Sequence, residues 1–150
     1  MSSHLLHSLI HYWADAFPLD VPTLYPGMVL NTEDHAAWLE LWLDAWTDPP
    51  HRHASPPPTS CLATVHCFTR PSASLTQCHT LADAASTTLA RQFLPIRDFS
   101  ASGTPVLGHL SLYEPETRSL TRTASRAVEL PLQHLVITIP GRVHPLMETA

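Results

Sequence analysis

Residues 38–46 read WLELWLDAW, and the strict alternation of this run sets the expected architecture. Alternate side chains of a β-strand point to opposite faces of a sheet. One face would carry Leu39, Leu41, Leu43 and Ala45, and the other would carry Trp38, Glu40, Trp42, Asp44 and Trp46. The apolar residues of the run also satisfy a helical period, but we interpret the run as a strand.

The three tryptophans of this run share their expected face with carboxylates. Large aromatic side chains are common where one protein surface meets another. We therefore expect this face to be covered, either by the first helix of the chain or by a neighbouring subunit. The candidate contact residues are Trp38, Trp42 and Trp46.

A second alternating run follows at residues 61–69, which read CLATVHCFT. Between the two runs lie Pro49-Pro50 and Pro56-Pro57-Pro58, which cannot donate backbone hydrogen bonds to a sheet. The sequence therefore predicts a β-ribbon with a protruding proline-rich loop at about residues 48–59. At the tip of this loop, His51, Arg52 and His53 are further candidate contact residues for a subunit or a tube.

Two segments have helical periodicity. In residues 1–17 the apolar positions recur at helical spacing up to Pro18, and in residues 75–94 the periodic positions run from Cys78 to Phe93. Residues 18–27 hold three prolines and a glycine, which indicate an extended connector that neither continues the helix nor enters the sheet.

Short alternating segments follow at 96–99, 106–113, 119–124 and 132–139. The order predicts an α+β domain spanning 1–150, with a mainly antiparallel sheet and two helices packed on one of its faces. We expect the C-terminal tail, about 143–150, to be flexible.

Composition limits the possible functions. Apolar residues make up 44% of the chain and charged residues 14%, which is typical of a folded chain rather than a disordered one. The net charge is −5 and all eight basic residues are arginines, which argues against a protein that mainly grips a phosphate backbone. Three cysteines, no secretory pattern and no long apolar run predict a cytoplasmic protein without a membrane segment.

Eleven histidines and three cysteines raise the possibility of a metal site or a thiol-dependent enzyme. However, the chain has no CxxC, HExxH or GxSxG motif, and on a strand His66 and Cys67 point to opposite faces. We therefore expect no metal, no cofactor and no catalytic residues. A small metal- or thiol-dependent enzyme remains the less favoured alternative.

Arg118, Arg122 and Arg126 form the one local cluster of basic residues. They would either protect a solvated sheet edge or, repeated around a ring, form a basic annulus that faces DNA or an acidic partner. A nucleic-acid-binding adaptor that uses this segment is a third hypothesis.

Eight features, in chain order, carry a resemblance to a known family. They are the amphipathic first helix and the runs VPTLYPG (21–27), WLELWL (38–43), ATVHCF (63–68), LADAA (81–85), LPIRDF (94–99), GHLSL (108–112) and LQHLVI (132–137). In order and spacing they resemble the tail-terminator proteins of long-tailed phages, the family of minor tail protein U in lambda-like phages.

The resemblance implies a structural virion protein, assembled in the host cytoplasm, whose main partner is itself in a closed ring, commonly a hexamer. Such a ring caps the tail tube, stops its polymerisation and offers the face on which the head docks, and DNA passes through it. The other implied partners are the tail tube protein and a head–tail connector or stopper protein. Another neck protein of connector or stopper type is the alternative. The proline-rich loop falls where the family has a variable ribbon tip.

Overall fold

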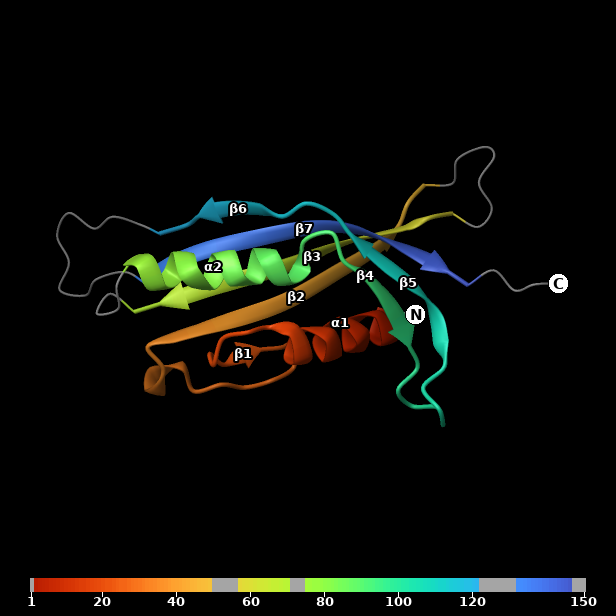
Figure 1. Ribbon diagram of the computed structural model, residues 1–150, viewed down its shortest axis with the longest axis horizontal. Helices are drawn as coiled ribbons and strands as arrows, with labels where there is room; N and C mark the ends of the chain where they lie inside the picture. The colour runs from red at the N-terminus through yellow and green to blue at the C-terminus, as the bar shows by residue number, and fades with distance from the viewer. Residues whose placement is uncertain (1, 50–56, 71–74, 122–131, 147–150) are drawn as a thin grey trace.

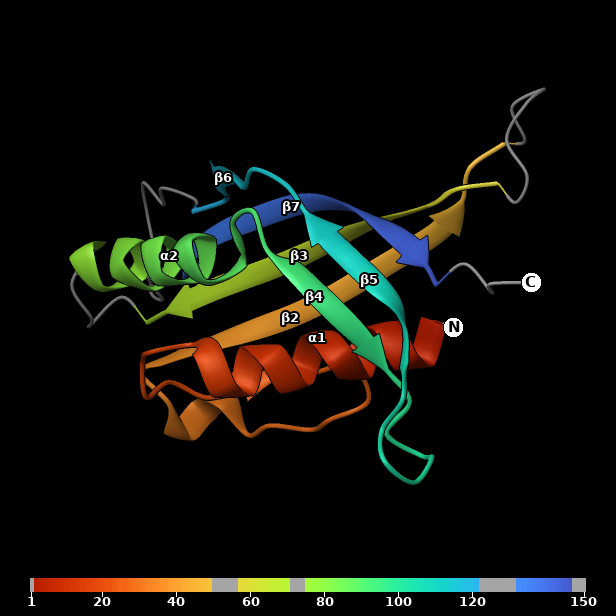
Figure 2. The same ribbon diagram turned by 45° about the vertical axis from the view of Figure 1, so that its right-hand side comes forward.

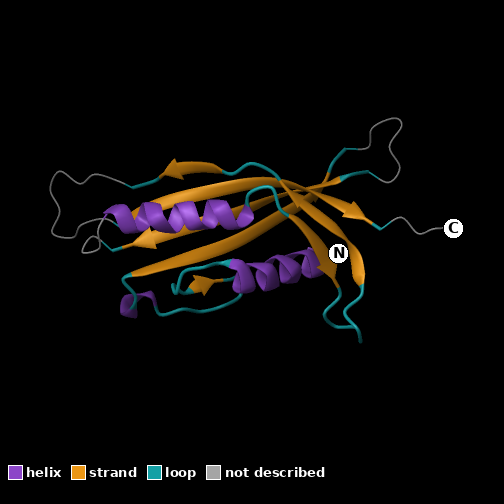
Figure 3. Ribbon diagram, in the orientation of Figure 1, coloured by secondary structure: helices purple, strands orange, loops and turns teal. Residues whose placement is uncertain are grey.

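The computed structural model describes residues 2–49, 57–70, 75–121 and 132–146. The two helices and the curled sheet confirm the predicted α+β fold (Figures 1 and 3). In chain order the elements are α1 (Ser2–Ala16), β1 (Thr23–Leu24), the 3-10 turn η1 (Thr32–Asp34), β2 (Ala37–Thr47), β3 (Thr59–Thr69), α2 (Leu75–Leu89), β4 (Phe93–Arg97), β5 (Val106–Leu112), β6 (Glu116–Ser119) and β7 (Gln133–Pro145).

The sheet has the order β1-β2-β3-β7-β5-β4, and β6 also pairs with β7. Every pairing is antiparallel except that between β1 and β2. The predicted connector therefore does enter the sheet: Thr23 and Leu24, between two prolines, pair with β2 at its edge. Edge positions tolerate nearby prolines because only one side of the strand needs hydrogen bonds.

Strands β2 and β3 form the predicted ribbon, paired from Ala37↔Thr69 to Thr47↔Thr59. The ribbon extends past both helices toward its tip (Figure 2). The candidate residues His51, Arg52 and His53 lie outside the described residues, as does most of the proline-rich loop.

Both helices pack on one face of the sheet and share its core. Along β3, Cys61, Ala63, Val65 and Cys67 are buried while the residues between them are half-buried, as the alternation predicts. Leu5, Leu9 and Trp13 of α1 join the same cluster as Leu81, Ala85 and Leu89 of α2. Each fully buried large apolar side chain stabilises the fold by roughly 1.5–3 kcal/mol.

The second helix is shorter than its periodicity predicts. Helix α2 ends at Leu89, and Arg91 then adopts a left-handed conformation with φ 54°, which stops the helix. Phe93, expected on the buried helical face, instead begins β4 and is 62% exposed. Pro95, expected to precede the next strand, lies inside β4, which tolerates it as an edge strand.

Strand β7 organises the C-terminal half because β3, β5 and β6 all pair with it. Leu112 pairs with Gly141 and Glu116 pairs with Thr138, so the chain carries one extra residue between β5 and β6. The two strands therefore form one bulged strand along β7.

The C-terminal strands correct two predictions. The expected strand at 119–124 begins earlier, since β6 starts at Glu116 and ends at Ser119, and residues 122–124 lie outside the described residues. The expected flexible tail at 143–150 is wrong for 143–145, since Val143 is buried and β7 continues to Pro145. Residues 147–150 lie outside the described residues.

Candidate functional site

The face of the sheet opposite the helices, here called the open face, holds the predicted tryptophans. The first helix does not cover them, because α1 packs against the Leu39 and Leu41 side of β2. Trp42 and Trp46 are 43% and 49% exposed. These two predicted contact residues thus remain available to a partner.

Trp38 lies on the same face but is only 4% exposed. Its ring stacks on Phe68 at a centroid distance of 5.2 Å, and the Arg70 guanidinium lies 5.5 Å from its centroid. Arg70 also donates hydrogen bonds to the carbonyl oxygens of Thr32 and His35, which holds the η1 segment against the ribbon. Trp38 therefore packs within the subunit and offers little surface to a partner.

A pair of histidines extends this aromatic row across the sheet. Nδ1 of His66 and Nε2 of His134 are 2.8 Å apart, and the His134 ring stacks on Phe68 at 4.2 Å. Burial lowers the pKa of both histidines, while nearby Glu40 opposes the shift. The hydrogen bond between the rings needs at least one neutral imidazole to accept it, so the bond is lost when both rings are protonated.

A second aromatic cluster lies on the open face beside β4. Phe93 stacks on His109 with ring centroids 4.6 Å apart and lies 6.4 Å from His144. His144 in turn shares a hydrogen bond of 3.0 Å with the Ser111 hydroxyl. The exposed Phe93 thus adds an apolar position at the opposite side of the face from the tryptophans.

Of the predicted basic cluster, the structure describes Arg118 alone, since Arg122 and Arg126 lie outside the described residues. Arg118 pairs with Val136 and so lies on the open face, where its side chain is 70% exposed. Its Nε lies 3.6 Å from Oε1 of Glu116, an exposed ion pair of the kind that contributes little to stability.

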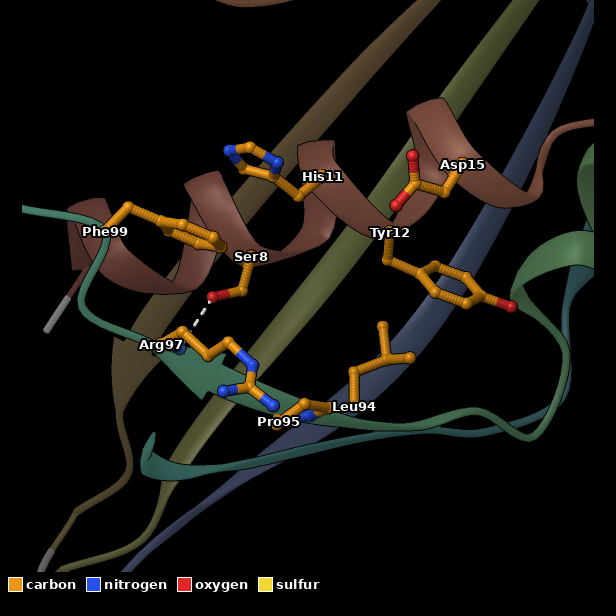
Figure 4. Close-up of a pocket in the computed structure, with 8 residues that line it drawn as sticks. All are labelled: Ser8, His11, Tyr12, Asp15, Leu94, Pro95, Arg97 and Phe99. Atoms are coloured by element: carbon orange, nitrogen blue, oxygen red, sulfur yellow. Dashed lines mark hydrogen bonds between the residues drawn. The ribbon is translucent and has the colours of Figure 1, made fainter. Parts of the chain in front are cut away.

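One pocket lies between α1 and β4 and has a volume of about 290 Å³ (Figure 4). Its one aliphatic hydroxyl, on Ser8, donates to the carbonyl oxygen of His4 at 2.7 Å and accepts from the backbone nitrogen of Arg97 at 2.9 Å. His11 stacks on Phe99, 4.1 Å away. This hydroxyl is engaged in structural hydrogen bonds and has no basic partner that would activate it.

The cysteines are structural residues of the core. Burial raises the pKa of Cys61 to about 11, and burial together with nearby Cys78 raises that of Cys67 to about 12. All three thiols are buried and free, so they stay protonated near neutral pH and supply no thiolate nucleophile. Within the described ranges, no three His, Cys, Asp or Glu side chains gather as a metal site would require.

In the part of the chain that the structure describes, no helix has the length and apolar character needed to cross a bilayer.

No family model matches the chain, and no curated protein is significantly similar to it. The geometry of the open face therefore carries the functional argument.

Sequence reasoning missed the His66–His134 pair and the Phe93 cluster. In both, the side chains come from strands distant in sequence, and their pairing register decides that they meet. The sequence held only a weak signal for the histidine pair. His134 and Thr138 alternate with apolar residues in 132–139, which indicates a polar face on that strand. The alternation does not indicate which other strand pairs with it.

Proposed function

We propose that this chain is a structural subunit of a closed ring, of the tail-terminator type found in long-tailed phages. The observation that carries the proposal is the exposure of Trp42 and Trp46 on the open face of the sheet, away from both helices. Monomeric proteins seldom leave neighbouring tryptophans on an uncovered face, whereas subunits of permanent assemblies bury them at their contacts.

The chemistry of the described residues agrees with a structural role. The thiols are buried and protonated, and the pocket hydroxyl is engaged in backbone contacts. The order of elements, a helix, a ribbon, a second helix and further strands, is the α+β order that the sequence predicts. The proposed function therefore depends on the surfaces that contact other subunits.

The mechanism is geometric. A ring that matches the last layer of the tail tube covers its polymerising surface, so no further tube subunit can dock, and the opposite side of the ring receives the head connector. DNA passes through the central opening. The protein resides in the neck of the virion and assembles in the host cytoplasm.

Native mass spectrometry and negative-stain images of the purified protein test the proposal. We expect closed rings, commonly hexamers, at micromolar concentration. The double variant Trp42→Ser/Trp46→Ser should shift the protein to monomer, and Met28→Ser, which removes an equally exposed apolar side chain away from the sheet, should not. A wild-type protein that stays monomeric at every concentration would contradict the proposal.

Tube-growth assays separate the tail terminator from its neighbours in the neck. Rings added to the cognate tail tube protein should stop its polymerisation at a defined length. Rings that leave tube growth unchanged but bind the head connector would instead favour a connector or stopper protein.

A further inference from the structure

Apart from the two-residue end strand β1 and the outer edge of β4, two strand edges of the sheet have no neighbour among the described strands. Strand β1 pairs only with Leu39 and Glu40, so the outer edge of β2 is unpaired from Leu43 to Thr47. Strand β6 pairs with β7 on one side and with no described strand on the other. Free edges such as these are templates for strand addition from another chain.

The hydrogen bonds that each strand makes to its neighbour within the subunit show which of its residues point their backbone N–H and C=O groups outward. Asp48 of the ribbon donates to Pro58, so on β2 the even-numbered residues face β3 and the odd-numbered ones face outward. Leu120 donates to His134, so on β6 the even-numbered residues face β7. The outward groups therefore belong to Leu43, Ala45 and Thr47 on β2 and to Thr117 and Ser119 on β6.

The remaining edge, on β4, is closed to strand addition. Pro95 has no N–H to offer, and the outward N–H of Arg97 already donates to the Ser8 hydroxyl on α1. Protection of one edge by proline and by a helix is a known means of preventing unwanted pairing. No described residue gives the outer edges of β2 and β6 the same protection.

Strand direction also fits a contact between the two free edges. Strands β2 and β7 are parallel because both run antiparallel to β3, and β6 runs antiparallel to β7. A second copy placed beside the first in the same orientation therefore presents its β2 antiparallel to β6. This is a head-to-tail contact between different surfaces, the kind that generates a ring.

We propose that β6 of one copy pairs with β2 of the next, with Thr117 opposite Ala45 and Ser119 opposite Leu43. This register joins outward-facing backbone groups on both strands. It also sets Arg118 opposite Asp44 and Leu120 opposite Trp42, all on the open face of one continuous sheet. The proposal rests on the ring assembly above and names the contact that builds it.

Charge reversal tests the register. Asp44 and Arg118 are both exposed, so neither substitution disturbs the core. Asp44→Arg or Arg118→Asp should raise the concentration needed for assembly by about tenfold or more, because each places like charges in contact. The double variant Asp44→Arg/Arg118→Asp should restore assembly. Asp83→Arg, the same charge change at an exposed position of helix α2, should leave assembly unchanged.

Removal of an outward donor tests the backbone pairing independently. Thr117→Pro and Ala45→Pro each delete an N–H that faces away from the subunit, so the urea midpoint of the monomer should change little while ring assembly is lost. If the wild-type protein forms rings and all of these variants form them equally well, the edge contact is wrong but the proposed ring assembly is not contradicted. A monomeric wild-type protein would overturn both.

Discussion

The hydroxyl oxygen of Ser8 accepts a hydrogen bond of 2.9 Å from the backbone nitrogen of Arg97 and so ties helix α1 to the edge of strand β4. Ser8 is 6% exposed, and the same hydroxyl donates to the carbonyl oxygen of His4. The Ser8 side chain here accepts the hydrogen bond that a neighbouring strand would otherwise accept from the backbone N–H of Arg97. The contact also explains why the helix lies beside β4 (Figure 4).

Ser8→Ala should therefore lower the free energy of unfolding by about 1–3 kcal/mol, because it leaves a poorly hydrated N–H without an acceptor. Urea denaturation measures the change. Thr80→Ala is the matched control, since Thr80, at an exposed position of helix α2, makes the same hydroxyl-to-carbonyl bond but accepts no bond from a described strand. Equal losses for the two variants would show that the strand contact contributes nothing.

The two kinds of tryptophan should respond differently to truncation. Trp38→Ala removes a buried ring that stacks on Phe68, and we expect a loss of about 3–5 kcal/mol in the free energy of unfolding. Trp46→Ala, near the ribbon tip, should cost the monomer less than about 1 kcal/mol. Both are measured by urea denaturation under conditions that keep the protein monomeric. A large loss for Trp46→Ala would assign that ring to the monomer core rather than to a contact.

The long periodic segments were predictable because their periodicity reflects burial on one side. Residues 38–46 and 61–69 alternate as strands must, and the structure pairs them along their full length. The first helix also follows its apolar stripe, from Leu5 to Trp13. In these segments the local pattern and the tertiary contacts agree, so the sequence alone was sufficient.

Element ends and contacts between distant strands were not predictable in the same way. Phe93 continues the helical period from Leu89, and the left-handed backbone at Arg91 overrides that period. The alternation correctly placed Trp38, Trp42 and Trp46 on one face, but it did not decide whether the first helix covers them. The burial of Trp38 involves Arg70, which the sequence did not link to it. His66 and His134 meet because β3 pairs with β7, across 68 positions of sequence.

Gly141 is required by close packing rather than by its backbone angles. A Cβ atom at this position would lie 2.8 Å from the Cys61 sulfur and 2.8 Å from the carbonyl oxygen of Ser111. Gly141→Ala should therefore destabilise the protein by about 1–3 kcal/mol, as overpacking in a core does. Thr138→Ala, on the same strand but half-buried on the open face, is the control, and thermal unfolding is the measurement. An unchanged melting temperature for Gly141→Ala would contradict this packing.

The three cysteines should resist modification in the folded protein. Cys61 and Cys67 are 1% and 0% exposed, and their pKa values of about 11 and about 12 keep them as thiols. We expect a disulfide reagent to label them at least about a thousandfold more slowly than it does in urea, because labelling requires opening of the core. Ser102→Cys, in an exposed loop, supplies a fast internal reference. Rapid labelling of a native cysteine would show that the core opens readily.

Acidification should destabilise the fold through the His66–His134 pair. Folding lowers the pKa of both histidines below the ordinary value of 6.5, so below that value the unfolded chain binds more protons than the folded one. Their stabilising contribution is therefore complete above about pH 6.5 and is lost as the pH falls through the folded-state pKa values. Glu40 opposes this shift at both rings without reversing it.

The urea midpoint should accordingly decrease as the pH is lowered from about 7.5 to about 5.5. His134→Gln should make this decrease smaller, because it removes both the pair and its second titrating group. His79→Gln, which removes an exposed histidine of α2 outside the pair, is the control for the loss of one histidine. If the wild-type protein and His134→Gln lose stability equally on acidification, the pair does not set the pH response. His66 of this pair lies in the same register row as Glu40 and Arg118 across the open face, so protonation of the pair would also add positive charge to the face that carries the proposed subunit contact.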